Sequence, residues 1–329
     1  MIYYILQPFS DQAIVIASFI KENSSKRVVG VLLLDEKKGK SDEVYDDIIT
    51  VRTYDEINDL GVIVPTGAPS TEALLRKGDV QLGKIKMKKE NLGVFDKVNF
   101  LNHCRQVSLP IPLMLEFNEL KSSSFPLFYK EKNEKGGGLR GKANRFSDVE
   151  NLPHENLIFQ ELIDSKGTYG VAFLAKNGRI LTSFSHFEEE SYPQTGGSAT
   201  LIKSIDDLRL VELTQKFVES FNYSGWGLAE FKYCNKRKDF VFMEVNGKFW
   251  ASCFFTFKNN PLFLKLLFNI EITNHKIRSM LFIDRLLRTG LLNFIKVLFK
   301  NINSYKVLEG SLLKSFILGI LRDLRFIRK

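Results

Sequence analysis

The sequence lacks the features that mark secreted and membrane-spanning proteins. Its 329 residues include three cysteines, which are far apart and odd in number: Cys104, Cys234 and Cys253. This pattern argues against a disulfide framework or a zinc site, and favours a reducing compartment. No run of 18 uncharged apolar residues occurs, so we expect no transmembrane helix. The first residues lack a basic region and a small-residue cleavage site, so they predict a strand in a cytoplasmic protein, not a signal peptide.

Excess charge is absent from most of the chain. The net charge is +9, yet residues 1–260 carry 34 basic and 34 acidic side chains. Residues 261–329 carry 13 Lys and Arg against 4 acids, so the basic character belongs to this last part. The body therefore shows no general affinity for nucleic acid. With 44% hydrophobic residues, the chain is long enough for two or three compact units.

The first 90 residues predict a doubly wound α/β unit. Apolar strands are expected at 2–6, 28–34, 45–51 and 61–64. Helices are expected at 11–22 and after a cap at Ser70 or Thr71. Ligands approach such sheets at the carboxyl ends of strands, so residues 66–69 form either a substrate loop or an ordinary strand-to-helix turn.

An antiparallel hairpin is predicted over residues 225–252. Two runs rich in aromatic and β-branched residues flank a polar connection there. If the hairpin folds symmetrically about Arg237, Glu230 lies opposite Glu244, because each is seven residues from that centre. Two opposed carboxylates repel each other unless a cation lies between them.

Side-chain alternation adds a third oxygen ligand to this pair. Asn246 shares the face of Glu244, while Val241, Met243 and Val245 are expected to point to the other face and to be buried. Carboxylate and amide oxygens suit Mg²⁺ shared with a polyphosphate better than Zn²⁺. The alternative is an ordinary hairpin with two solvated glutamates.

A glycine-rich segment at residues 136–143 admits two interpretations. It comes within one residue of a Walker A motif, but Ala143 stands where Ser or Thr binds Mg²⁺. It also fits a hairpin loop whose backbone N–H groups close over phosphates, because three consecutive glycines allow close approach.

These motifs, in their order along the chain, resemble the ATP-grasp family. The passages that carry the resemblance are the Glu244-Val245-Asn246-Gly247-Lys248 strand, the Asp96-Lys97 helix followed by Leu109-Pro110-Ile111-Pro112, and the strand ending at Lys130 before the glycines. The resemblance implies an α/β (α+β) ATP-grasp fold in three parts. These are a pre-ATP-grasp domain at 1–92, an ATP-grasp domain at 93–260 with its lid at about 122–190, and a basic amphipathic helical region at 261–329.

The same resemblance assigns roles to individual residues. It implies ATP and Mg²⁺ as cofactors, with Glu230, Glu244 and Asn246 as metal ligands. ATP contacts would come from Lys97, Lys130, Gly136, Gly137, Gly138, Gln160, Glu161 and Ile163, and catalytic contacts from Lys248, His186 and Lys232. Weaker phosphate candidates are Lys132, Arg140 and Lys142, and Gly196, Gly197 and Ser198 are candidates for the acceptor pocket.

Three positions depart from the family pattern. Lys248 stands where Arg is usual, which keeps the charge but loses the bidentate fork. Thr168 offers a hydroxyl where an acidic residue usually holds the ribose, and an Arg common near Phe187 is missing.

The resemblance implies an ATP-dependent carboxylate–amine ligase that works through an acyl phosphate. We expect small-molecule substrates, with an amino acid joined to a sugar acid or amino sugar of a surface polysaccharide, on an acceptor that includes a lipid-linked glycan. Three alternatives stay open: a dipeptide or amino-acid ligase, a degenerate nucleotide-binding protein recruited to membranes, and, more distantly, a P-loop NTPase. The oligomeric state is left open.

The C-terminal region predicts basic amphipathic helices. At 100° per residue, one polar arc collects Asp284, Arg285, Arg288, Lys296 and Lys300, and a second helix is expected at 312–327. Such helices either dock on the body or lie on an anionic membrane. We expect residues 275–329 to contact the inner face of a membrane peripherally.

Overall fold

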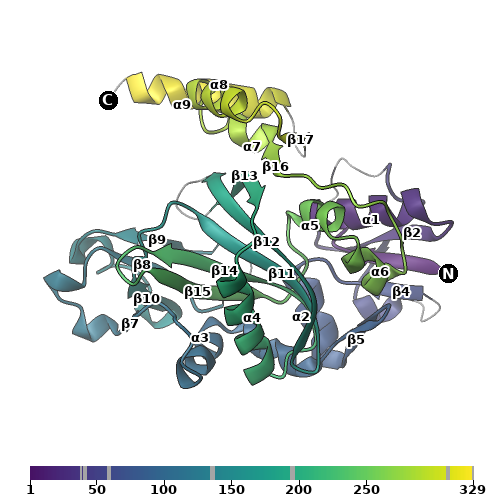
Figure 1. The fold of residues 1–329 in the computed structure, drawn as a ribbon, viewed down its shortest axis with the longest axis horizontal. Helices are drawn as coiled ribbons and strands as arrows, with labels where there is room; N and C mark the ends of the chain where they lie inside the picture. The colour runs from purple at the N-terminus through teal and green to yellow at the C-terminus, as the bar shows by residue number, and fades with distance from the viewer. Residues whose placement is uncertain are drawn as a thin grey trace.

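The computed structural model describes residues 1–37, 39, 43–57, 61–133, 138–192, 197–308 and 312–327. Within them the strands form four sheets, arranged as an N-terminal unit, a lid, a large central sheet and a small hairpin (Figure 1). This mixed architecture confirms the expected α/β (α+β) fold class.

The N-terminal unit is a parallel sheet, which confirms the predicted doubly wound pattern. Its strand order is β3-β2-β1-β4. Its elements are β1 (Ile2–Leu6), α1 (Asp11–Asn23), β2 (Arg27–Leu33), β3 (Asp47–Val51), β4 (Gly61–Val64) and α2 (Ala68–Lys77). The expected cap of α2 was wrong: Gly67 is the N-cap, and the Ser70 hydroxyl accepts the Gly67 N–H from inside the first turn.

The lid is a small antiparallel sheet that follows helix α3 (Lys97–Gln106). Asp96 caps α3, because its carboxylate accepts the N–H groups of Val98 and Asn99. The lid has the order β7-β10-β8-β9. Its strands are β7 (Met114–Leu115), β8 (Leu127–Glu131), β9 (Arg140–Ala143) and β10 (Leu157–Glu161).

The central sheet has seven strands in the order β15-β14-β11-β12-β13-β16-β17. All neighbours are antiparallel except β16 and β17. The strands are β11 (Thr168–Lys176), β12 (Arg179–Tyr192), β13 (Ser198–Ser204), β14 (Gly225–Cys234), β15 (Asp239–Asn246), β16 (Ser279–Phe282) and β17 (Tyr305–Val307). The predicted hairpin is therefore present, but its second strand ends at Asn246 rather than at residue 252.

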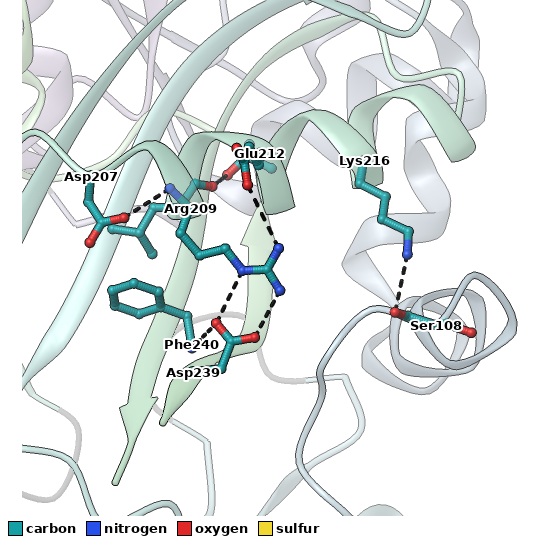
Figure 2. Close-up of polar contacts among 9 residues, drawn as sticks. Ser108, Asp207, Arg209, Glu212, Lys216, Asp239 and Phe240 are labelled. Atoms are coloured by element: carbon teal, nitrogen blue, oxygen red, sulfur yellow. Dashed lines mark hydrogen bonds and ion pairs between the residues drawn. The ribbon is translucent and has the colours of Figure 1, made fainter. Parts of the chain in front are cut away.

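Helix α4 (Leu208–Ser220) covers this sheet with an apolar face, as its sequence period predicts. Figure 2 shows how its first turn is tied to the start of β15. Arg209 donates from Nε and Nη2 to the two carboxylate oxygens of Asp239, at 3.2 and 2.8 Å. Both side chains are partly exposed, so the pair contributes roughly 0.2–1 kcal/mol and mainly fixes the register of helix and hairpin.

A continuous core joins the N-terminal unit to the central sheet. The buried cluster runs from Tyr3 to Ile270 and includes the hairpin β5 (Val80–Leu82) and β6 (Ile85–Met87). Helices α5 (Cys253–Asn259) and α6 (Leu262–Phe268) take part in this core, and the Tyr3 hydroxyl donates to the Phe268 carbonyl at 3.2 Å. The first part of the predicted C-terminal region thus packs against the first strand of the chain.

In the rest of the C-terminal region, the helix predicted at 312–327 is confirmed as α9, but the segment before it differs from a single helix. Residues 279–282 and 305–307 form β16 and β17, and the helices are α7 (Ile283–Leu287), α8 (Leu291–Lys300) and α9 (Leu312–Ile327). The single polar arc was wrong, because Gly290, with a φ of 112°, separates α7 from α8 and because Asp284 and Arg285 are buried. Helices α8 and α9 lie together at one end of the molecule, across α7 (Figure 1). In the part of the chain that the structure describes, no helix is long and apolar enough to cross a membrane.

Candidate active site

A cavity of about 780 Å³ lies between the lid and the central sheet. Its wall is formed by Ala68 at the start of α2, the start of α3 with the segment before it, and the lid strands with the segment after β10. The strands β12 and β13, the hairpin β14–β15 with the residues after it, and the region of α7 and α8 complete the wall. Ala68 belongs to the predicted substrate loop. The predicted site residues that line the cavity are Lys97, Lys130, Gln160, Glu161, Ile163, Gly197, Ser198, Glu230, Lys232, Glu244, Asn246 and Lys248.

Glu230 and Glu244 face each other across β14 and β15, as the hairpin symmetry predicted. The hairpin does not fold about Arg237, however: Cys234 pairs with Asp239, which places its centre half a residue earlier. A bulge between Glu230 and Phe231 restores the predicted pair, because it inserts one extra residue, Met243, on the opposite strand.

The bulge also changes which side chains share a face. Val241 and Met243 pack with Ile163 on the cavity side, and Met243 lines the cavity. Val245 lies in the main core. The expectation that these three share one buried face was therefore wrong, because the extra residue reverses the alternation.

The two carboxylates differ in their electrostatic surroundings. Burial, together with the charges of Glu244 and Glu188, raises the pKa of Glu230 above its ordinary value. Burial acts on Glu244 in the same direction, but Lys130 and Lys97 outweigh it, so the pKa of Glu244 is lowered. Glu244 is thus held ionised, while Glu230 is readily neutralised by a proton or a cation.

Asn246 completes an oxygen-rich group beside this pair. Its Nδ2 donates to Glu230 Oε1 at 2.8 Å, which leaves Oδ1 as an acceptor. Among the described residues no group of three or more His, Cys, Asp or Glu could hold a metal ion. The oxygen donors of Glu230, Glu244 and Asn246 fit a hard divalent cation that takes its other ligands from elsewhere.

Two lysines from different elements converge on Glu244. Lys130, on β8 of the lid, lies 3.3 Å from Glu244 Oε2, and Lys97, the first residue of α3, lies 3.8 Å from the same oxygen. Their side chains are only 7% and 12% exposed. Buried cations are costly unless paired, and Glu244 is the partner that both ammonium groups share.

Lys248 and Lys232 lie on opposite sides of the carboxylate pair along the hairpin. Lys248 follows β15, and Lys232 lies on β14 two residues beyond Glu230. Burial lowers the pKa of both ammonium groups, although neighbouring carboxylates, Glu230 foremost, oppose this shift. Both are therefore weakly hydrated cations facing the cavity.

The end of β10 brings a buried amide to the cavity. Gln160 is 1% exposed, and neither Oε1 nor Nε2 has a hydrogen-bond partner. An unpaired buried amide costs free energy, so this side chain fits a ligand that donates and accepts at the same edge. Glu161 differs, because its Oε1 accepts from Arg237 and from the Leu113 N–H. Ile163 contributes an apolar wall.

His186 does not line the cavity. It is buried on β12 beside Gly170, where a Cβ would lie 2.6 Å from the imidazole. Its Nε2 lies 3.7 Å from Glu188, which does line the cavity. Any effect of His186 on a ligand therefore passes through Glu188.

The structure describes only part of the glycine-rich segment. Gly136 and Gly137 lie outside the described residues, and so does Gly196; Gly138 is described but does not line the cavity. Arg140 and Lys142 do line it, whereas Lys132 donates to the Glu155 carbonyl. Lys142 belongs to strand β9, not to the start of a helix, so the Walker A interpretation was wrong.

Sequence reasoning missed the part of the wall that comes from α7 and α8. Arg285, Thr289 and Asn293 line the cavity there. Arg285 donates to Asp11 at 2.7 Å and to the Ala199 carbonyl at 3.2 Å, which fixes this wall to α1 and β13. The three residues are not on one helix, because α7 ends at Leu287 and α8 begins at Leu291, so no helical period in the sequence marks them as one face. Glu189, Glu190 and Asp164 also line the cavity.

Comparison with known proteins gives a result at the level of the fold. No protein-family model matches the chain, and no curated protein matches it. Among solved structures, Rhizobium etli pyruvate carboxylase is similar at 15% identity and a TM-score of 0.60, covering 79% of this chain and 27% of that one. Campylobacter jejuni biotin carboxylase, solved with a β,γ-ATP ligand, is similar at 14% identity and 0.61, covering 82% and 72%.

An L-amino acid ligase from Bacillus licheniformis is similar at 11% identity and a TM-score of 0.63, covering 84% of this chain and 79% of that one. This chain thus spans about a quarter of the pyruvate carboxylase and most of the two smaller proteins. These similar structures are ATP-grasp enzymes, and the likeness covers 79–84% of this chain. The chain has the ATP-grasp fold.

Proposed function

We propose that this protein is an ATP-dependent ligase that joins a carboxylate to an amine. ATP would phosphorylate the carboxylate, and the amine would attack the resulting acyl phosphate, so that an amide forms and phosphate leaves. The observation that carries this proposal is the convergence of Lys97 and Lys130 on the Glu230–Glu244 pair within one cavity. The similarity to ATP-grasp enzymes supports it.

Each group near the pair has a role in this chemistry. Glu230, Glu244 and Asn246 would hold Mg²⁺, which neutralises the charge of the transferring phosphoryl group. Lys97 and Lys130 would bind phosphate oxygens, and Lys248 would stabilise the acyl phosphate. Gln160 would bind the adenine edge, next to backbone groups of Glu161 and the apolar side of Ile163.

The remaining predicted roles concern the lid and the acceptor. Backbone N–H groups of Gly136, Gly137 and Gly138 would close over the phosphates and exclude the water that hydrolyses an acyl phosphate. Lys232 would contact a substrate anion, and His186 would orient Glu188. Neither role requires a protein nucleophile.

For the substrates we propose an amino acid and a sugar acid or amino sugar of a surface polysaccharide, with a lipid-linked glycan as one form of the acceptor. The protein would act in the cytoplasm at the inner face of a membrane, in contact through residues 275–329. The support for this proposal is that Thr289 and Asn293 line the cavity and lie in the same C-terminal region as the outermost helices, α8 and α9. An acceptor bound beside these two residues would therefore lie close to the proposed membrane contact. A second candidate, ligation of free amino acids, is favoured by the similarity to the L-amino acid ligase.

The test is phosphate release from Mg·ATP by the purified protein. Pools of amino acids are offered alone and with uronic acids, amino sugars or lipid-linked glycans, so that both candidates are covered. We expect release that requires one particular pair and that falls at least about a thousandfold in Glu244→Gln, because an ionised phosphate-facing carboxylate is lost. The matched control is Glu219→Gln on the exposed face of α4, which should release phosphate at the unaltered rate.

Phosphate release by Glu244→Gln at the rate of the unaltered protein would contradict the proposal. So would the absence of release with every pair, if calorimetry also shows no binding of Mg·ATP.

A further inference from the structure

Helix α9 does not dock on the protein by its apolar side. The residues it buries are Ser315 and Gly319, one turn apart, while Leu313, Phe316 and Ile317 are 70%, 45% and 49% exposed. In an ordinary surface helix the apolar stripe faces the protein and the polar residues face water. The apolar face of α9 therefore lacks the protein partner that its sequence suggests.

Specific polar contacts hold α9 in this orientation. Arg288 Nε donates to Ser315 Oγ at 3.1 Å, and the Leu291 N–H donates to Asp323 Oδ2 at 2.8 Å. A Cβ at Gly319 would lie 2.4 Å from the Leu287 carbonyl oxygen, so the helix approaches α7 closely at its only glycine. These contacts recur every four residues, and they show that the polar face of α9 is the one built to dock.

Helix α8 extends the same apolar surface. Its exposed residues include Leu292, Ile295 and Phe299, at 78%, 49% and 71%, while Val297 is buried. We call Leu292, Ile295, Phe299, Leu313, Phe316 and Ile317 the outer surface of α8 and α9. In Figure 1 the two helices lie together as the outermost layer of this end of the molecule. Large exposed apolar patches of this kind mark a binding surface.

The simplest occupants of this surface are a second copy of the chain and an anionic bilayer, and the charge around the surface distinguishes them. Lys296 on α8 and Lys314 on α9 are exposed, and so is Lys300, whose Nζ also lies 3.9 Å from Glu189 Oε1. Residues 261–329 carry 13 basic and 4 acidic side chains, whereas the rest of the chain is balanced. A second copy would bring two such basic regions face to face. An anionic bilayer complements them, because acyl chains receive the apolar residues and headgroups receive the lysines.

We infer that the outer surface of α8 and α9 docks on an anionic lipid bilayer, with both helices lying in the plane of the headgroups. The polar side of α9 stays on α7, α8 keeps Val297 packed in one cluster with Leu286, and Leu313, Phe316 and Phe299 enter the boundary between headgroups and acyl chains. The membrane contact is thereby assigned to α8 and α9, since most of residues 279–287 are buried in the fold. The inference does not depend on the chemistry of the cavity.

The experiment is sedimentation of the full chain with vesicles of phosphatidylcholine alone or mixed with phosphatidylglycerol. We expect tighter binding to the mixed vesicles. For the double variant Leu313→Glu/Phe316→Glu we expect binding at least about a hundredfold weaker, because it loses two apolar side chains that the bilayer would bury. The control is Leu208→Glu, which changes an equally apolar residue that is 81% exposed on α4 of the body and should leave binding unchanged. Thermal unfolding of each variant confirms that it is folded.

Three results would overturn the inference. One is equal sedimentation of the unaltered protein and the folded double variant. Another is no sedimentation of the unaltered protein with either vesicle. The third is a dimer in light scattering that the double variant converts to monomer, which would assign the surface to a second copy. A second variant, Lys296→Glu/Lys300→Glu, should weaken binding to mixed vesicles only.

Discussion

Helices α4 and α9 are both amphipathic, but they place opposite faces against the protein. Helix α4 buries Leu210, Leu213 and Phe217 against the central sheet, and its charged residues face water. Helix α9 buries Ser315 and Gly319 and presents leucine, isoleucine and phenylalanine outward. The sequence period is the same in the two helices. What differs is what each helix packs against, so the first face serves stability and the second is available for binding.

The cavity departs from the usual burial pattern in the opposite sense to α9. There, side chains that usually face water are buried or half-buried: Lys97, Lys130, Glu230 and Glu244 lie together, and the amide of Gln160 has no hydrogen-bond partner among the described residues. Buried charges and unpaired polar groups cost folding free energy. The cavity lowers folding stability, and the outer surface of α8 and α9 exposes apolar area to water. These two costs mark the two regions as binding sites.

The largest expected effect separates the two helices by stability. Phe217→Ala should lower the free energy of unfolding by about 3–5 kcal/mol, because a fully buried ring packed on Phe100 and Phe242 is lost. Phe316→Ala on α9 should change it by less than about 0.5 kcal/mol, because the ring is exposed. Urea unfolding measures both. A loss of several kcal/mol in Phe316→Ala would show that the outer face of α9 is packed, and the contrast with α4 would fail.

A smaller effect sharpens the same contrast inside the cavity. Gln160→Leu replaces an unpaired buried amide with an apolar group of similar size, so the melting temperature should stay the same or rise. The affinity for ATP should fall about tenfold, because the hydrogen bonds to the base are lost. Thermal unfolding and calorimetry measure the two quantities. A lower melting temperature with unchanged ATP affinity would instead give Gln160 a purely structural role.

The central pair of carboxylates could be predicted from the sequence because a hairpin leaves few choices. Polar connection and aromatic runs fixed the two strands, and counting outward placed Glu230 opposite Glu244. The bulge at Met243 could not be predicted, since it is a feature of the pairing between β14 and β15 that the residue pattern does not mark. The predicted centre of the hairpin was half a residue too late, and the extra residue of the bulge compensates for this, so that Glu230 still pairs with Glu244. The bulge also places Met243 at the cavity.

The C-terminal region shows where pattern reasoning stops. A helical period says that one face is apolar, but not which face contacts the body, so α9 could be located without its orientation. Short strands such as β16 and β17 pair over long sequence distances, and their apolar residues also fit a helix. Arg285 and Thr289 reach the cavity through that pairing, which the local sequence does not record. The position of His186, behind Gly170 rather than in the cavity, likewise depends on strand register.

The most direct test of the proposed chemistry follows one oxygen atom. Once a substrate pair is found, its carboxylate is labelled with the heavy isotope of oxygen, and the phosphate released from ATP is analysed by mass spectrometry. An acyl phosphate requires a carboxylate oxygen to leave with the phosphoryl group, so the account predicts one labelled oxygen in each phosphate and an amide product in equal amount. Unlabelled phosphate would mean that water attacks ATP, and would contradict the ligase mechanism.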